Sequence, residues 1–217
     1  MKVIDLFSGL GGFSQAFLDR GHDVVRFDND EQFKEVSNTI ICDVMDLTPE
    51  DLCDYLWDKP DIILASPPCN CFSPMTIGHY WSDNIKPHLQ ERKDHMIDLV
   101  KHTLKIIEEA DPRYWILENP AGMLKHVIGE PDVLTWWGAW GHFSLKPTHL
   151  WGKFPPIDWR PKPKKGTYEE AKRGARAGIQ RANLSPADRA LVPYDFSLAV
   201  CLAAEGTSPQ QTLEEYI

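Results

Sequence analysis

The sequence of 217 residues contains no long apolar run. No stretch approaches the roughly 20 apolar residues that a membrane-spanning helix needs. The start, MKVIDLFSG, also lacks the apolar core and the cleavage site of a signal peptide. Both absences argue against a membrane or secreted protein, so we expect a cytoplasmic protein that makes no membrane contact.

The sequence also lacks the cysteine patterns of metal sites and disulfide frameworks. Its five cysteines form no CxxC pair and have no histidines at zinc-finger spacing. Cys69 and Cys71 stand too close together for a comfortable bridge, and the total number is odd. We therefore expect no bound metal and no disulfide.

An overall positive charge is missing as well. Lys and Arg number 23 against 32 Asp and Glu, which gives a net charge of −9 and is unfavourable for binding nucleic acid. Residues 146–181, however, hold ten basic and three acidic side chains. Such a run is either a solvated insertion or a contact surface for phosphates. The candidates for nucleic-acid binding are Lys153, Lys162, Lys164, Lys165, Arg173 and Arg176.

Short apolar runs alternate with helical patterns as far as Pro120. We expect strands at residues 2–7, 23–30, 39–44, 61–66 and 113–120. Helices are expected at residues 13–20, 48–58 and 92–111, the second with Thr48 as its N-cap and Pro49 in its first turn. This alternation predicts the α/β class, with a doubly wound, mostly parallel sheet that is covered on both faces.

Beyond Pro120 the pattern is weaker. Residues 135–140 and 148–152 read as strands, 155–165 as a proline-rich basic loop and 197–206 as a helix. We expect a catalytic core at 1–145, a short basic segment at 146–181, and at 182–217 a helix that returns to the core, followed by a tail.

A glycine turn, DLFSGLGGFS, joins the first strand to the first helix. Glycines allow close approach of a ligand, and amides at the start of a helix can hold an anionic group. The pattern is not GxGxxG, so an ordinary tight turn is the alternative. Asp28 ends the second strand, where an acidic residue accepts hydrogen bonds from ribose hydroxyls. Asp43 follows the third strand and could accept from an adenine amino group; either Asp could instead cap a turn.

The stretch DIILASPPCNCFS runs an apolar strand into two prolines and then Cys69. Because prolines fix the backbone, Cys69 is held on a stiff loop at the edge of the sheet where ligands collect. It is either a nucleophile or an inert buried thiol. Glu118 ends the apolar run YWIL, where a carboxylate is costly unless it has a function. It is either an acid with a raised pKa or a structural residue bonded to amides.

In this order, four elements resemble the DNA cytosine methyltransferases that act on carbon 5. They are DLFSGLGG, the pair Asp28 and Asp43, PPCNCFS, and ENP, where that family usually has Glu-Asn-Val. The resemblance implies the Rossmann-like fold of the methyltransferases that use S-adenosylmethionine. It also implies a monomeric enzyme of a prokaryotic or phage-infected cell, of the kind found in restriction-modification systems, with DNA as its partner.

By this resemblance Cys69 adds to carbon 6 of a flipped cytosine, and Glu118 binds the base at nitrogen 3 and at its amino group. Phe7 packs on the adenine, the glycine loop holds the methionine part, Asp28 holds the ribose and Asp43 the adenine amino group. The cofactor residues so implied are Phe7, Gly9, Leu10, Gly11, Gly12, Asp28, Asn29, Asp43 and Pro68.

The sequence departs from that family in two ways. The family has a QxRxR strand after the Glu motif, whereas TWWGAWG has no arginine, and Lys146 is a candidate substitute. The family's large target-recognition domain is replaced by the basic segment. Two alternatives therefore remain open: a catalytically weak member that only binds DNA, and an RNA cytosine methyltransferase.

Overall fold

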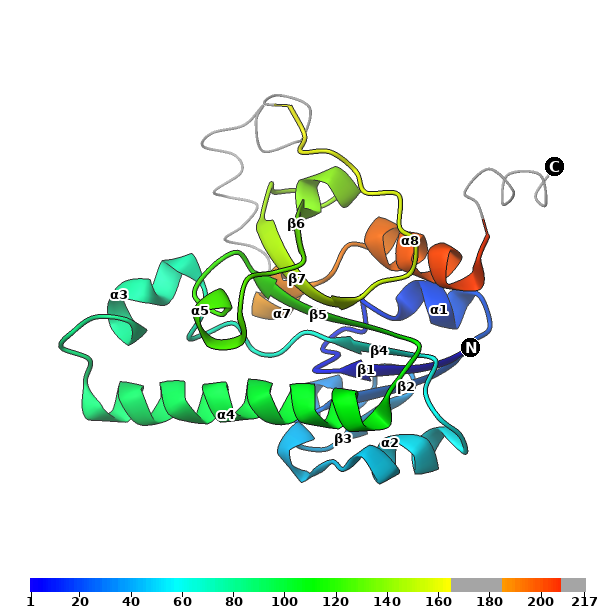
Figure 1. Cartoon of the computed structure of the whole chain (residues 1–217), viewed down its shortest axis with the longest axis horizontal. Coiled ribbons are helices and arrows are strands. Elements are labelled where there is room, and N and C mark those ends of the chain that lie inside the picture. Colours follow the sequence, from blue (N-terminus) through cyan, green and yellow to red (C-terminus); the bar gives the residue numbers. More distant parts are fainter. Residues whose placement is uncertain (165–184, 208–217) are drawn as a thin grey trace.

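The computed structural model describes residues 1–164 and 185–207, which form a seven-stranded sheet between two layers of helices (Figure 1). The strand order is β3-β2-β1-β4-β5-β7-β6. Neighbouring strands from β3 to β5 are parallel, and β7 is antiparallel to both β5 and β6. The strands are β1 (Lys2–Leu6), β2 (Asp23–Asp28), β3 (Thr39–Ile41), β4 (Ile62–Ala65), β5 (Tyr114–Pro120), β6 (Val133–Trp136) and β7 (Pro147–Lys153).

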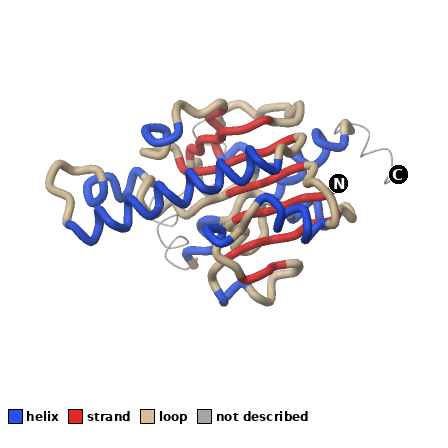
Figure 2. Tube along the Cα trace, turned by 60° about the horizontal axis from the view of Figure 1, so that its bottom comes forward, coloured by secondary structure: helices blue, strands red, loops and turns tan. Residues whose placement is uncertain are grey.

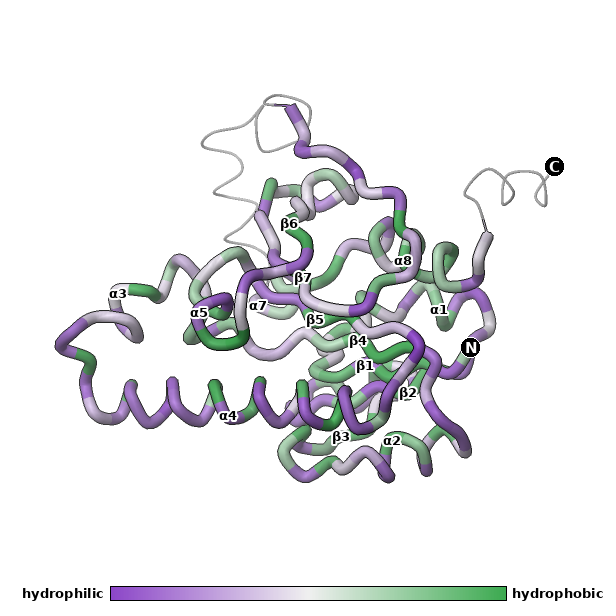
Figure 3. The backbone as a smooth tube through the Cα atoms, viewed as in Figure 1, coloured by the Kyte–Doolittle hydropathy of each residue, from purple (hydrophilic) through white to green (hydrophobic). Residues whose placement is uncertain are grey.

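Successive residues of the central strands point to opposite faces of the sheet, as the pleat requires. In β4, Ile63 and Ala65 pack in one hydrophobic cluster, and Ile62 and Leu64 pack in the other. All four side chains are buried, which explains why the strand reads as a continuous apolar run. In Figure 3 the green, hydrophobic stretches of the backbone lie mainly along the central strands.

The helices form two layers, one on each face of the sheet (Figures 1 and 2). One layer holds α2 (Pro49–Leu56) and α4 (Pro87–Ala110), and the other holds α1 (Gln15–Asp19) and α8 (Tyr194–Glu205). The remaining helices are α3 (Ile77–Tyr80), α5 (Lys125–Ile128) and α7 (Pro186–Ala190), with 3-10 turns η1 (Glu31–Phe33), η2 (Val44–Asp46), η3 (Pro74–Thr76) and η4 (Trp137–Trp140).

The long helix α4 extends past the end of the sheet, and α3 lies beside its first turns (Figures 1 and 2). Although α4 has 24 residues, its outer face is charged. Within residues 1–164 and 185–207, no helix is both long and apolar enough to cross a membrane.

The predicted α/β class and the mostly parallel sheet are confirmed. Thr48 caps α2 through a capping box with Asp51, and Pro49 occupies the first turn, as predicted. The predicted strand at 135–140 is wrong beyond Trp136, because Trp137 and Trp140 turn inward as the 3-10 helix η4 and are almost fully buried. The helix predicted from residue 92 begins earlier, at Pro87, since proline fits a first turn.

Candidate active site

The carboxyl ends of the parallel strands bring the predicted residues to one edge of the sheet. The glycine loop follows β1, Asp28 ends β2, Cys69 follows β4 and Glu118 lies near the end of β5. The strand order reverses between β1 and β4, and in sheets of this kind ligands bind at the carboxyl edge at such a reversal. The antiparallel strand β7 begins at this same edge, because Pro120 pairs with Thr148.

The glycine loop has an unusual backbone conformation. Phe7, Gly9 and Gly11 have φ values of 60°, 51° and 78°. The amide of Gly9 donates to Oδ2 of Asp28 at 2.8 Å, which ties the loop to the end of β2. A Cβ atom on Gly11 would lie 2.5 Å from the guanidinium carbon of Arg26, so only glycine fits there.

A buried polar network supports this loop from below. Ser14 Oγ donates to Oδ2 of Asp5 at 2.6 Å and accepts from Nε of Arg26 at 2.8 Å. Arg26, only 1% exposed, also donates to the carbonyl of Gly11 at 3.0 Å. Burial raises the pKa of Asp5 to about 6, against the lowering effect of Ser14 and Arg26. The network therefore fixes the glycine loop from within the core.

Two buried polar atoms without partners in the described part of the chain lie just after β1 and β4. The hydroxyls of Ser8 and Ser66, just after these two strands, are buried and have no hydrogen-bond partner among the described residues. Such groups are costly unless a ligand satisfies them. The glycine loop and these two hydroxyls supply donors and acceptors of the kind that the amino acid and ribose parts of S-adenosylmethionine need. Both oxygens of Asp28 already accept from backbone amides, Oδ2 from Gly9 at 2.8 Å and Oδ1 from Asp30 at 3.0 Å, so Asp28 holds a turn, which was its alternative interpretation.

The other predicted cofactor residues follow strands β1 to β4. Asp43 accepts from the amide of Met45 at 2.9 Å, so it caps η2, which was the alternative interpretation of this residue. The side chains of Leu10, Asn29 and Pro68 are exposed at the loops after β1, β2 and β4.

The loop that carries Cys69 is rigid. The carbonyl of Cys69 accepts from the amides of Phe72 and Ser73, both at 2.9 Å. The carbonyl of Phe72 accepts from the amide of Met123 at 2.8 Å. A Cβ atom on Gly122 would lie 2.1 Å from that carbonyl oxygen, so a glycine is needed for the close approach. Two stretches distant in sequence thus hold each other in place.

Asn119 also holds this loop, and it was missed as a functional residue. Its Nδ2 donates to the carbonyl of Pro67 at 3.0 Å, which links β5 directly to the nucleophile loop. On the outer side, Nε1 of Trp81 donates to the carbonyl of Cys71 at 2.7 Å. The position of Asn119 beside Glu118 in ENP was the available signal. Arg26, also missed, was signalled by a charge inside the apolar run DVVRF.

Glu118 is buried, with 6% of its surface exposed. Burial raises the pKa of its carboxyl to about 7, against the lowering effect of the Lys146 charge. Its Oε1 has no hydrogen-bond partner in the described part of the chain. The predicted alternative, a carboxylate bonded to backbone amides, is therefore not what the structure shows for this oxygen.

Cys69 is half-buried, and the charge of Glu118 acts on its thiol. Burial and the nearby Glu118 carboxylate raise the pKa of the Cys69 thiol, whereas Lys146 lowers it. Lys146 lies just before β7, and its Nζ donates to the carbonyl of Arg189 at 3.1 Å. The edge thus combines a thiol, a buried acid and one cation that acts on both.

The structure separates the predicted nucleic-acid residues. Lys153 pairs with Trp115 at the start of β5, so it lies at the edge opposite Cys69. Lys162 lies 5.6 Å from the ring of Trp136, at the end of β6 and therefore on the active-site edge. Lys164 is exposed. The other three candidates, Lys165, Arg173 and Arg176, lie outside the described residues.

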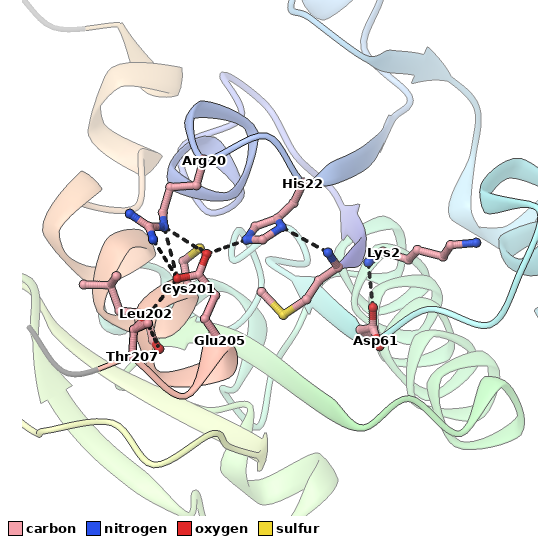
Figure 4. Close-up of polar contacts among 9 residues, drawn as sticks. Lys2, Arg20, His22, Asp61, Cys201, Leu202, Glu205 and Thr207 are labelled. Atoms are coloured by element: carbon pink, nitrogen blue, oxygen red, sulfur yellow. Dashed lines mark hydrogen bonds and ion pairs between the residues drawn. The ribbon is translucent and has the colours of Figure 1, made fainter. Parts of the chain in front are cut away.

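A second polar cluster lies away from this edge (Figure 4). Glu205 on α8 accepts from Nη2 of Arg20 and from Nε2 of His22, both at 2.8 Å, and the terminal amine of Met1 bonds to Nδ1 of His22 at 3.0 Å. The ligand atoms of His22, Cys201 and Glu205 lie within 4.8 Å of one another. Since Arg20 binds both oxygens of Glu205, its charge opposes a metal ion there.

The chain matches known proteins in sequence and in fold. Residues 1–131 match the family model of the C-5 cytosine-specific DNA methylases. A probable DNA (cytosine-5)-methyltransferase of Frog virus 3 is 28% identical over 160 residues, which cover 70% of each chain. The type II methyltransferase M1.HphI of Haemophilus parahaemolyticus is 26% identical over 140 residues, 60% of this chain.

The chain spans only 35% of the length of M1.HphI. Among solved structures, a putative DNA modification methyltransferase encoded within a prophage (E. coli) has a TM-score of 0.50 and 21% identity. The match covers 70% of this chain and 46% of that one, and it shows a shared fold.

Proposed function

Since the chain belongs to the C-5 cytosine-specific DNA methylase family, we propose that it transfers a methyl group from S-adenosylmethionine to carbon 5 of cytosine in DNA. One observation carries the proposal: a buried, unpartnered carboxyl oxygen of Glu118 lies at the same edge of the sheet as Cys69. A cytosine placed there can offer its ring nitrogen and amino group to the carboxyl while carbon 6 faces the sulfur.

The sulfur of Cys69 is the nucleophile of this reaction. It forms a bond to carbon 6, and the electron pair displaced from the carbon 5–carbon 6 double bond gives carbon 5 enamine character. When bound, S-adenosylmethionine supplies an electrophilic methyl group to carbon 5. Water then takes the proton from carbon 5, the double bond re-forms as the thiolate of Cys69 leaves, and nitrogen 3 returns its proton to Glu118.

Glu118 acts as the acid at nitrogen 3 of the base. Its raised pKa allows it to carry a proton near neutral pH, and donating that proton stabilises the charge that develops as carbon 6 is attacked. A neutral Glu118 also removes the negative charge that raises the pKa of the Cys69 thiol. Protonation of the acid and ionisation of the nucleophile therefore favour each other.

Lys146 supplies the positive charge at this site. It lowers the pKa of both Cys69 and Glu118, so it stabilises the thiolate before attack. No arginine follows the Glu motif before this position in the sequence. We assign to Lys146 the electrostatic part of the role that the QxRxR arginines have in the family.

DNA is the proposed partner, with the base flipped out of the duplex because neither carbon 5 nor carbon 6 is accessible within the stack. We assign to Lys162, on the active-site edge, a contact with phosphates, which gives affinity without reading sequence. The basic segment is short, so we expect recognition of a short site. We further propose that the protein acts as a monomer in the cytoplasm.

The test is to express the protein in cells that lack cytosine methylation and to sequence their DNA for 5-methylcytosine. Modified cytosines at a defined short site support the proposal, and their loss in Cys69→Ser shows that the protein makes them. Labelled transfer to RNA but not to DNA would assign the activity to RNA. Absence of transfer to both, with DNA binding intact, would leave a DNA-binding role.

A further inference from the structure

Asn119 and His149 carry two buried polar atoms that the proposed reaction does not use. Oδ1 of Asn119 and Nδ1 of His149 are enclosed, and neither has a hydrogen-bond partner among the described residues. The two residues stand directly opposite each other in the antiparallel pairing of β5 with β7. Side chains in such a pair point to the same face of the sheet, with their Cβ atoms about 4.5–5.5 Å apart. Each unpartnered atom is therefore within reach of the other, directly or across one water.

The neighbouring residues identify the face on which this pair lies. Leu117 and Trp151 form the equivalent pair two positions away, and both pack in the hydrophobic cluster on the α4 face. The ring of His149 lies 5.7 Å from the ring of Trp151, with its edge toward that ring. Nδ2 of Asn119 donates to the carbonyl of Pro67, two residues before Cys69. His149 thus adjoins the side chain that holds the nucleophile loop.

The bond to Pro67 decides which ring nitrogen of His149 must carry the proton. A carbonyl only accepts, so the atom of Asn119 that faces Pro67 is Nδ2, and the remaining Oδ1 needs a donor. Burial lowers the pKa of His149; the charge of Lys125 acts in the same direction, and that of Glu130 opposes it. The ring is therefore neutral near pH 7 and has a single N–H. An N–H at Nδ1 satisfies both enclosed atoms, whereas an N–H at Nε2 would leave two acceptors facing each other.

We propose that His149 holds its proton on Nδ1, donates a hydrogen bond to Oδ1 of Asn119, directly or through one water, and thereby positions Cys69 for attack. This bond keeps the Asn119 amide in the orientation that donates to Pro67. An amide free to turn would present its oxygen to that carbonyl, and the link to the nucleophile loop would be lost. His149 is a positioning residue, since it acts through Asn119. Its effect on turnover rests on the proposed function, whereas the hydrogen bond itself does not.

Nitrogen-15 NMR of histidine-labelled protein measures where the proton lies. The spectra are recorded near pH 7 without DNA or cofactor, and His149 is assigned by the loss of its signals in His149→Leu. We expect a protonated Nδ1 and an unprotonated Nε2 in the wild type. In Asn119→Leu, whose side chain accepts no hydrogen bond, the proton should move to Nε2. A wild-type ring that carries its proton on Nε2, or one that Asn119→Leu leaves unchanged, would overturn the proposal.

Two polar variants separate the hydrogen bond from the packing of the ring. Asparagine places an amide N–H near the position of Nδ1, whereas glutamine places it near that of Nε2. We expect His149→Asn to retain most of kcat, and His149→Gln and His149→Leu to lower kcat about tenfold with little change in KM for DNA. His126, exposed on α5, provides the matched control, and His126→Gln should match the wild type. Equal losses in His149→Asn and His149→Gln, or a change confined to KM, would contradict the positioning role.

Alkylation of Cys69 reports the state of the nucleophile loop without any turnover. The rate of labelling by iodoacetamide, followed by mass spectrometry, should rise about fivefold in His149→Gln, the factor that the loss of one hydrogen bond gives, and should stay at the wild-type value in His149→Asn. Buried Cys71 is the internal reference. An unchanged rate at Cys69, or an equal rise at Cys71, would overturn the proposal.

Failure of the proposed function has a different signature. Wild-type protein that transfers no methyl group to DNA contradicts that function, and the NMR and alkylation results then decide the inference about His149 on their own.

Discussion

Replacing Glu118 by Gln should make the protein more stable above neutral pH while abolishing its activity. The unfolded carboxyl ionises near 4.5, whereas burial raises the folded-state pKa to about 7. Between these values the folded state binds the proton more strongly, so the free energy of unfolding of the wild type falls as pH rises through this window. The difference between these two pKa values corresponds to a loss of about 3 kcal/mol in the free energy of unfolding, at about 1.36 kcal/mol per pKa unit.

A glutamine side chain in place of Glu118 is neutral at every pH, so the Glu118→Gln variant escapes that loss. We expect urea denaturation to show equal stabilities near pH 4 and a gain for Glu118→Gln of up to about 3 kcal/mol at pH 8. The gain corresponds to a rise in Tm of about 6–12 °C for a chain of this size. A variant that is no more stable at pH 8, or a difference that does not change with pH, would refute the assignment of a buried, destabilising acid.

Glu205 is the control of opposite sign. Its pKa is lowered to about 2, because hydrogen bonds from Arg20, His22 and Thr207 outweigh the effect of partial burial. It therefore contributes stability above its unfolded pKa and loses it only as pH falls toward 2. Glu205→Gln should cost about 1.5–3 kcal/mol at both pH 5 and pH 8. If Glu118→Gln and Glu205→Gln change stability in the same direction at pH 8, burial of the ionised Glu118 is not the cause of the change.

Three further outcomes are expected. Cys69→Ser should abolish methyl transfer while calorimetry shows cofactor binding retained, and Cys71→Ala should stay active; the reverse result would move the nucleophile to Cys71. Lys146→Met should raise the pKa of both reacting groups, lower the rate at pH 7 by roughly tenfold and shift the pH–rate profile upward; an unchanged profile contradicts its electrostatic role. Gly122→Ala should lower the free energy of unfolding by about 1–3 kcal/mol and displace the nucleophile loop. The rate of methyl transfer should therefore fall even where the variant remains folded, and a wild-type rate would show that the loop tolerates the added methyl.

The sequence predicts the parallel part of the fold well, because buried strands such as residues 62–65 are continuous apolar runs and because Thr48 and Pro49 mark a helix start. It also predicts that Cys69 and Glu118 lie at one edge of the sheet, because the carboxyl ends of parallel strands lie at the same edge. It fails for residues 137–140, where tryptophans that resemble a strand pack inward as a 3-10 turn.

The other features of the site depend on contacts between segments that are distant in the sequence, and no local sequence pattern predicts those contacts. Lys153 looked like part of one basic surface with Lys162, but the antiparallel pairing of β7 carries it to the opposite edge. The role of Asn119 depends on a hydrogen bond to Pro67, which is 52 positions earlier in the sequence. The support of the glycine loop by Arg26 likewise depends on how β2 lies beside β1.

The reversal of direction at β7 also explains where this fold can change in length. After β7 the chain returns to the active-site edge, where Lys162 stacks on Trp136. Further along, the carbonyl of Arg189 is fixed to Lys146 at that same edge. Lys162 and Arg189, which lie on either side of residues 165–184 in the sequence, thus both meet the active-site edge. A change in the number of residues between them leaves the register of β7 with β5 and β6 as it is.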